Sequence, residues 1–166
     1  MNAPVSLPAL RRRHWSALAA AALLGGAGLP LRAAGRTLPL SVSLPDELAQ
    51  ALAGRQPLVV MVSLHRCPWC EEVRNNYLAP MREREGLPVV QVDMRSEQGT
   101  RTVQGAGITH DALVRAWQVK VAPTVLFLGR DGAEVADRLI GGSPDFYHGY
   151  LERRLEQARQ AVAAAP

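Results

Sequence analysis

The chain has 166 residues and a mass of 18.0 kDa, enough for one well-buried core and a short appendage. Four of its 19 basic residues lie in the first 34 positions, which contain no acidic residue. The remainder therefore carries 15 basic and 15 acidic residues, with a formal net charge of zero and no basic run. This balance gives no support to nucleic-acid binding, and no nucleic-acid partner is predicted.

Residues 1–34 have the three parts of a secretory signal. An arginine cluster at 11–13 precedes an apolar stretch at 15–31, and small residues at 33–35 close it. We therefore predict an N-terminal signal peptide and export of the protein. A membrane anchor is the alternative, although three glycines and a proline make this stretch a poor spanning helix. The sequence leaves open whether the signal is cleaved and whether export follows the Sec or the twin-arginine route.

Residues 35–57 are predicted to lead into the main domain with a short strand and a helix. The strand is expected at 37–43, and the helix at 46–53 with Pro45 at its first position. Residues 58–64 are apolar except for Ser63 and rich in valine. This pattern predicts a central strand that is buried on both faces.

The middle of the chain alternates helix and strand. A helix is predicted over 70–84, and Pro80 should kink it. The next strand is predicted at 87–94. The polar, glycine-containing segment 95–108 is predicted to be a loop of a length usually reserved for function or mobility. Thr109 is the predicted N-cap of the helix that follows it.

The last part is predicted to hold a hairpin and a helix. Strands are expected at 125–128 and 134–140, joined by a turn at 130–132. After a glycine pair, Ser143 should cap a helix whose first turn contains residues 144–145. The β-α-β start predicts a parallel pair of strands and the hairpin an antiparallel pair. The fold class is thus α/β, with a mixed central β-sheet flanked by helices on both faces.

The only two cysteines, Cys67 and Cys70, follow the predicted central strand. Any disulfide within one chain must join them, and so small a ring cannot staple a fold, which favours a chemical role. Cys67 should lie at a helix N-terminus, where free N–H groups stabilise a thiolate, and Arg66 and His65 add positive charge. We predict that Cys67 is the nucleophile and that Cys70, facing inward, resolves the mixed disulfide.

The residues between the cysteines have two interpretations each. Pro68 suits the first helical turn. We assign it to tuning the pKa of the Cys67 thiol, and the alternative is that it is an ordinary helix-start residue. Trp69 is assigned to substrate contact, or does no more than shape the surface. Zinc would need two further ligands, and the histidines are scattered, whereas Cu(I) needs only two thiolates. No metal and no cofactor are predicted, with a soft-metal dithiol as an alternative.

At this point the chain resembles the thioredoxin superfamily over roughly residues 58–163. The resemblance rests on three ordered features: Cys-Pro-Trp-Cys at 67–70, Val-Ala-Pro-Thr at 121–124 and Gly-Gly at 141–142. It implies a thioredoxin-like domain over 58–166 and thiol–disulfide exchange. It also implies that Pro123 is cis and lies against the disulfide, which leaves the backbone of Ala122 free to pair with substrate.

The chain departs from thioredoxins proper at two places. Met61 stands where they carry a buried acid that accepts a proton from the resolving cysteine, and the motif at 67–70 has the proline and aromatic order of glutaredoxins. These departures leave the direction of electron flow open. The segments at 130–132 and 143–147 look most like exported bacterial thioredoxin-like proteins, which makes the predicted location periplasmic.

We therefore predict a monomeric periplasmic thiol–disulfide oxidoreductase that reduces disulfides on exported proteins and is recharged by a membrane-bound thiol reductant. About fifty residues separate the cysteines from Pro123, too few for the helical domain that oxidase-type relatives insert there. This spacing favours the reductase. A disulfide-donating oxidase, a copper-binding dithiol module and a domain with an inert disulfide are the alternatives.

Overall fold

The structure is a computed structural model, and it describes residues 36–142 and 145–165. The predicted signal peptide at 1–34, and Ser143 with Pro144, lie outside the described residues. Among the helices that are described, none has both the length and the apolar character needed to cross a bilayer.

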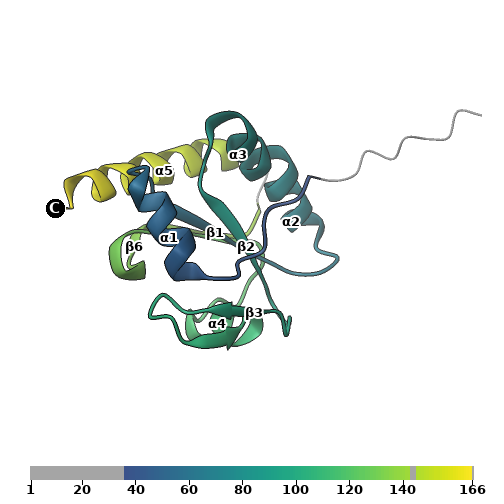
Figure 1. Cartoon of the computed structure of the whole chain (residues 1–166). Coiled ribbons are helices and arrows are strands. Elements are labelled where there is room, and N and C mark those ends of the chain that lie inside the picture. Colours follow the sequence, from purple (N-terminus) through teal and green to yellow (C-terminus); the bar gives the residue numbers. More distant parts are fainter. Residues whose placement is uncertain (1–35, 143–144, 166) are drawn as a thin grey trace, which may run out of the picture. The chain divides into compact units, whose positions relative to one another are not determined.

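A four-stranded mixed sheet forms the centre of the domain, in the order β2-β1-β5-β6 (Figure 1). Its strands are β1 (Leu58–Ser63), β2 (Val89–Asp93), β5 (Thr124–Leu128) and β6 (Glu134–Ile140). β1 is parallel to β2 and antiparallel to β5, and β5 is antiparallel to β6. The predicted α/β class with a mixed sheet is confirmed.

Helices cover both faces of this sheet. One face packs against α1 (Leu44–Ala53) and α4 (His110–Ala116). The other packs against α2 (Pro68–Val73), α3 (Ala79–Glu85) and α5 (Tyr147–Ala164). Successive side chains of a strand point to opposite faces, so the residues of β1 alternate between two cores and all six are buried. This explains the apolar run.

The predicted kink at Pro80 takes the form of a π-helical segment. η1 (Arg74–Leu78) lies between α2 and α3, and the N–H of Ala79 donates to the carbonyl of Arg74, five residues back. Proline has no N–H to donate and its ring crowds the carbonyl four residues earlier. A π-bulge relieves both problems while the helical stretch continues to Gly86, which ends it with φ of 68°.

Two predictions about irregular segments are wrong. In place of a strand at 37–43, a single parallel bridge joins Leu40 to Gln91 on the outer edge of β2. In place of a loop at 95–108, the chain forms a small antiparallel ladder of β3 (Gly99–Arg101) and β4 (Gly107–Thr109). Three-residue strands have no readable period, so the pattern of the sequence could not reveal them.

A buried histidine joins these two segments to the sheet. His110, the first residue of α4, has no exposed surface. Its Nδ1 accepts from the N–H of Asp93 at 3.1 Å, and its Nε2 lies 2.8 Å from the carbonyl oxygen of Ser41. This pairing assigns the ring proton to Nε2. Thr109 caps α4 as predicted, accepting from the N–H of Ala112 at 3.2 Å.

The last helix begins later than predicted. α5 starts at Tyr147, with Phe146 in a left-handed conformation before it, so Asp145 lies outside the helix.

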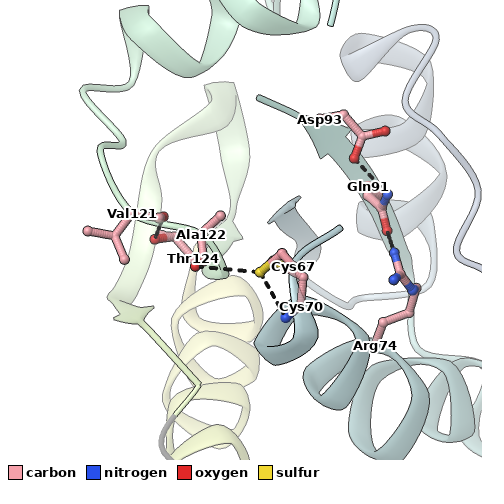
Figure 2. Close-up of a disulfide and its surroundings, with 8 residues drawn as sticks. All are labelled: Cys67, Cys70, Arg74, Gln91, Asp93, Val121, Ala122 and Thr124. Carbon is pink, nitrogen blue, oxygen red and sulfur yellow. Dashed lines mark hydrogen bonds between the residues drawn. A yellow bond between two sulfur atoms is a disulfide. The ribbon is translucent and has the colours of Figure 1, made fainter. Parts of the chain in front are cut away.

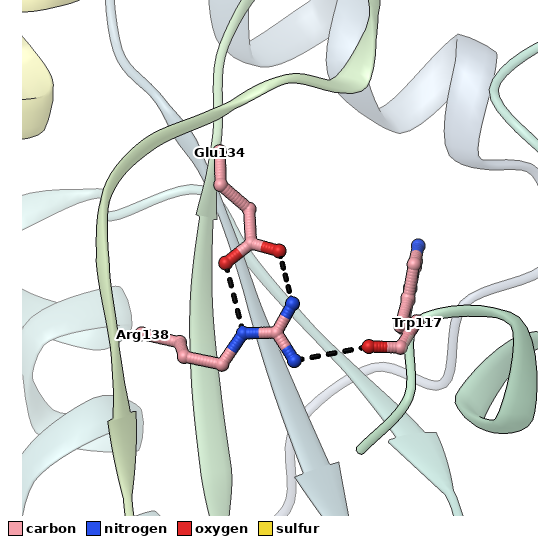
Figure 3. Close-up of polar contacts among 3 residues, drawn as sticks. All are labelled: Trp117, Glu134 and Arg138. Carbon is pink, nitrogen blue, oxygen red and sulfur yellow. Dashed lines mark hydrogen bonds and ion pairs between the residues drawn. The ribbon is translucent and has the colours of Figure 1, made fainter.

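β6 carries Arg138, which pairs with Glu134 and donates to the carbonyl of Trp117 at 3.0 Å (Figure 3). The hydrogen bonds that Arg138 donates to the Glu134 carboxylate raise the pKa of Arg138. The contact with Trp117 ties the edge strand to the end of α4.

Candidate redox site

Cys67 and Cys70 form a disulfide at the N-terminus of α2 (Figure 2). Their Cα atoms are 5.2 Å apart, and Cys67 is the N-cap residue of the helix. The N–H of Cys70 donates to Cys67 Sγ at 3.1 Å, and Pro68 occupies the first helical turn as expected. A helix N-terminus leaves N–H groups without a partner four residues back, and here the N–H of Cys70 is shared between the sulfur and the carbonyl oxygen of Cys67 at 3.0 Å. The same donor stabilises negative charge on that sulfur when the disulfide is open.

The two sulfur-bearing residues differ in burial. Cys70 has no exposed surface and belongs to the apolar cluster that also contains Met61 and Val73. Cys67 is half-buried at the edge of the same cluster. An incoming thiol or disulfide can therefore approach Cys67 only, which is the geometry expected of a nucleophile with a resolving partner.

The segment before β5 brings the second predicted part of the site to this sulfur. The Ala122–Pro123 peptide bond is cis, as the resemblance implies, and the carbonyl oxygen of Ala122 lies 3.9 Å from Cys67 Sγ. Because a disulfide sulfur has no proton, this is a contact and not a hydrogen bond. The hydroxyl of Thr124 donates to the carbonyl of Val121 at 2.7 Å and holds the segment in place.

Gly142 has a packing role that the sequence did not reveal. A Cβ added there would lie 3.1 Å from Cβ of Trp69 and 3.4 Å from Cγ of Pro123. The chain after β6 therefore passes closely over Trp69 and Pro123, two of the three predicted substrate-contact residues, and glycine leaves room for it. The glycine pair could be read from the sequence as a chain break, but its neighbours could not.

Exposed apolar side chains surround this part of the site. Trp69 is 51% exposed, Val121 48% and Ile140 65%. Ile140 pairs with Thr124 across β5 and β6, which places it next to the segment that touches Cys67. We call these three residues the apolar rim. Sequence reasoning identified only Trp69, because exposure of the other two depends on where the strands end.

The predicted pKa-tuning residues lie directly before Cys67. His65 and Arg66 are both exposed, and Arg66 has a left-handed backbone with φ of 56°. Within 36–142 and 145–165, neither side chain makes a hydrogen bond or an ion pair. Their influence on Cys67 stays a prediction. In the same described ranges, no group of three or more His, Cys, Asp or Glu side chains could hold a metal ion.

Solved structures with this fold include proteins that are distant in sequence. A DsbH oxidoreductase is 16% identical, with a TM-score of 0.52 over 85% of this chain and 96% of that chain. A poplar thioredoxin h is 21% identical, with a TM-score of 0.47 over 65% of this chain and 84% of that chain. Thioredoxin O2 from Arabidopsis thaliana is 16% identical, with a TM-score of 0.47 over 69% and 93%. At such identities the likeness concerns the fold alone.

The sequence also matches a known family across most of the described domain. Residues 44–153 match the thioredoxin-like domain, and the match begins at the first residue of α1. No curated protein sequence matches the chain. A thioredoxin-like fold with a Cys67–Cys70 pair at a helix N-terminus supports thiol–disulfide exchange as the general chemistry of the site. The chain belongs to the thioredoxin-like family.

Proposed function

We propose that the protein is a periplasmic thiol–disulfide oxidoreductase that reduces disulfides on exported proteins. The observation that carries this proposal is the contrast between the two cysteines. Cys67 is accessible and accepts an N–H at a helix N-terminus, while Cys70 is fully buried one turn later. That pairing suits a two-step exchange in which one sulfur meets the substrate and the other completes the reaction.

In the reduced protein, the Cys67 thiolate attacks one sulfur of the substrate disulfide. The other substrate sulfur leaves as a thiolate and takes a proton from water, which leaves a mixed disulfide at Cys67. Cys70 then loses its proton and attacks Cys67 Sγ, and the second substrate sulfur leaves. Two electrons pass to the substrate and the Cys67–Cys70 disulfide forms.

Three observations support the direction and the location. Between α2 and Pro123 the chain forms η1, α3, β2, the β3–β4 ladder and α4, with no separate inserted domain. The composition of residues 1–34 is that of an export signal. A structural relative bears the name DsbH oxidoreductase. A membrane-bound thiol donor would return the electrons, and the protein would act as a monomer on exported substrates.

The reduction potential of the Cys67–Cys70 couple tests the direction. The protein without its first 34 residues is equilibrated against glutathione or dithiothreitol, and the fraction of dithiol is measured after acid quench and alkylation. A potential near about −250 mV or lower supports the reductase. A potential near about −120 mV identifies a strong oxidant and contradicts the proposed direction.

A further inference from the structure

A charged cleft lies beside the redox site, at the carboxyl ends of the parallel strands β1 and β2. It has a volume of about 470 Å³. Its lining includes Arg66, which precedes Cys67, and Glu71, whose N–H donates to the carbonyl of Cys67 at 3.0 Å. Ligands of α/β proteins commonly bind outside the carboxyl ends of parallel strands. Residues of the cleft therefore adjoin the backbone of Cys67, and the cleft lies in a favourable part of the fold.

Three arginines from three separate elements line this cleft. Arg66 follows β1, Arg95 follows β2 and Arg74 begins η1. Arg66 and Arg95 both have left-handed backbones, with φ of 56° and 58°. This conformation is uncommon for a residue with a long side chain and costs on the order of 1 kcal/mol, and such residues cluster at functional sites. Two of the six described non-glycine residues with a positive φ line this cleft.

A buried glutamine organises the wall of the cleft. Gln91 is 8% exposed, and its Oε1 accepts from Arg74 at 3.0 Å while its Nε2 donates to Asp93 at 2.7 Å (Figure 2). One arginine and one carboxylate are thereby held in place through the amide. Within the described part of the chain, the side chains of Arg66 and Arg95 make no hydrogen bond or ion pair.

The charges of the cleft favour an anion. Its lining holds three arginines and two carboxylates, those of Glu71 and Asp93, so its formal charge is +1 before any protonation of His65. A guanidinium presents N–H donors in a planar fork that matches the two oxygens of a carboxylate. Asp93 accepts one hydrogen bond from Gln91, and Glu71 is the second acidic side chain in the lining.

We propose that this cleft binds a carboxylate that the substrate carries close to its disulfide, so that the protein prefers anionic disulfides. The inference rests on the proposed function, because the preference is expressed in the exchange reaction at Cys67. The apolar rim on the opposite side of the disulfide offers no charge with which to make this selection. Selection by charge would therefore depend on the charged side chains of the cleft.

The test uses three small symmetrical disulfides of different charge with the reduced protein. They are 3,3′-dithiodipropionate, which is anionic, bis(2-hydroxyethyl) disulfide, which is neutral, and cystamine, which is cationic. The oxidation of the protein by each disulfide is followed by acid quench and thiol alkylation. The readout is the rate with the anionic disulfide divided by the rate with the neutral disulfide. Comparing this ratio between variants cancels differences in leaving-group pKa and in the reactivity of Cys67.

The expected changes have opposite signs for the two kinds of lining residue. Arg95→Gln should lower the ratio about three- to fivefold, and Glu71→Gln should raise it about twofold, as expected for exposed charge pairs. Raising the ionic strength from about 20 mM to about 200 mM should lower the wild-type ratio. Arg101→Gln is the matched control, because Arg101 is an exposed arginine of β3 outside the cleft.

Two outcomes contradict different statements. If the ratio is the same in the wild type, Arg95→Gln and Glu71→Gln, the cleft does not bind the substrate carboxylate and the inference is overturned. If the reduced protein reacts with none of the three disulfides, the proposed function fails, and the cleft's role in exchange fails with it.

Discussion

The two sides of the Cys67 turn are built from different chemistry. On one side, the carbonyl oxygen of Ala122 approaches the sulfur, and the exposed apolar rim lies nearby in the chain. On the other side, the ends of β1 and β2 present arginines around a charged cleft. Backbone groups and apolar surface can accept many extended peptides, whereas guanidinium groups distinguish substrates by charge. The comparison teaches that general substrate contact and discrimination between substrates by charge can be assigned to separate elements around one disulfide.

Replacing either cysteine should have the largest effect on the rate of disulfide exchange, because every substrate reacts through this pair whichever side of the site it contacts. Cys67→Ser should reduce exchange with every disulfide to the level of the uncatalysed reaction, since the accessible nucleophile is lost. Cys70→Ser should accumulate mixed disulfides at Cys67, detectable by mass spectrometry of the intact protein. Normal turnover by Cys70→Ser would contradict the two-cysteine mechanism.

Among these variants, Met61→Asp should cause the largest loss of stability. Met61 has no exposed surface and lies in the apolar cluster that supports Cys70. An unpaired carboxylate there should lower the free energy of unfolding by about 3 kcal/mol or more at pH 7. Burial raises the pKa of such an acid in the folded state, so stability should fall as pH rises from about 5 to about 7.

Urea unfolding at both pH values measures this effect. Met61→Leu is the control, because a swap of similar volume should cost less than about 1.5 kcal/mol and show no such dependence on pH. Equal unfolding free energies for the aspartate and leucine variants would contradict this prediction, because they would show that the apolar cluster around Cys70 tolerates a charge.

Gly142→Val tests the close packing on the cis-proline side. The added side chain meets Trp69 and Pro123, so it should cost about 1–3 kcal/mol and displace part of the apolar rim. Reduction of a disulfide-containing peptide with apolar flanking residues should slow severalfold. Gly99→Val is the matched control, since nothing lies within 4 Å of the added Cβ at that position.

Trp69→Ala should have the smallest effect and sharpens the comparison most. Trp69 is 51% exposed beside the disulfide, so its loss should slow reduction of the same apolar peptide about fivefold, the effect of one interface contact worth about 1 kcal/mol. The ratio of anionic to neutral rates for small disulfides should stay that of the wild type. A change in that ratio would mean that the two sides do not act separately.

Sequence pattern identified the four strands of the main sheet and most of the helices, because burial on one or two faces leaves a period in the chain. It failed where hydrogen bonds to distant residues decide the structure. The backbone of Gln91 accepts from Ser41 and donates to Pro39 at the edge of β2, and the β3–β4 ladder places Thr100 beside Ser41. Neither arrangement depends on neighbours in the sequence.

By itself, the sequence determined which two sulfurs can pair, that Cys67 begins a helix and that Cys70 turns inward, because these follow from residues within one helical turn. Only the tertiary structure decided what surrounds that pair. Ala122 reaches the sulfur from 55 residues away, which only a family resemblance implied beforehand, and Arg95 comes to the same turn from the end of a different strand, which nothing in the sequence indicated. Such neighbours are set by how the sheet and its helices pack, which a local pattern does not encode.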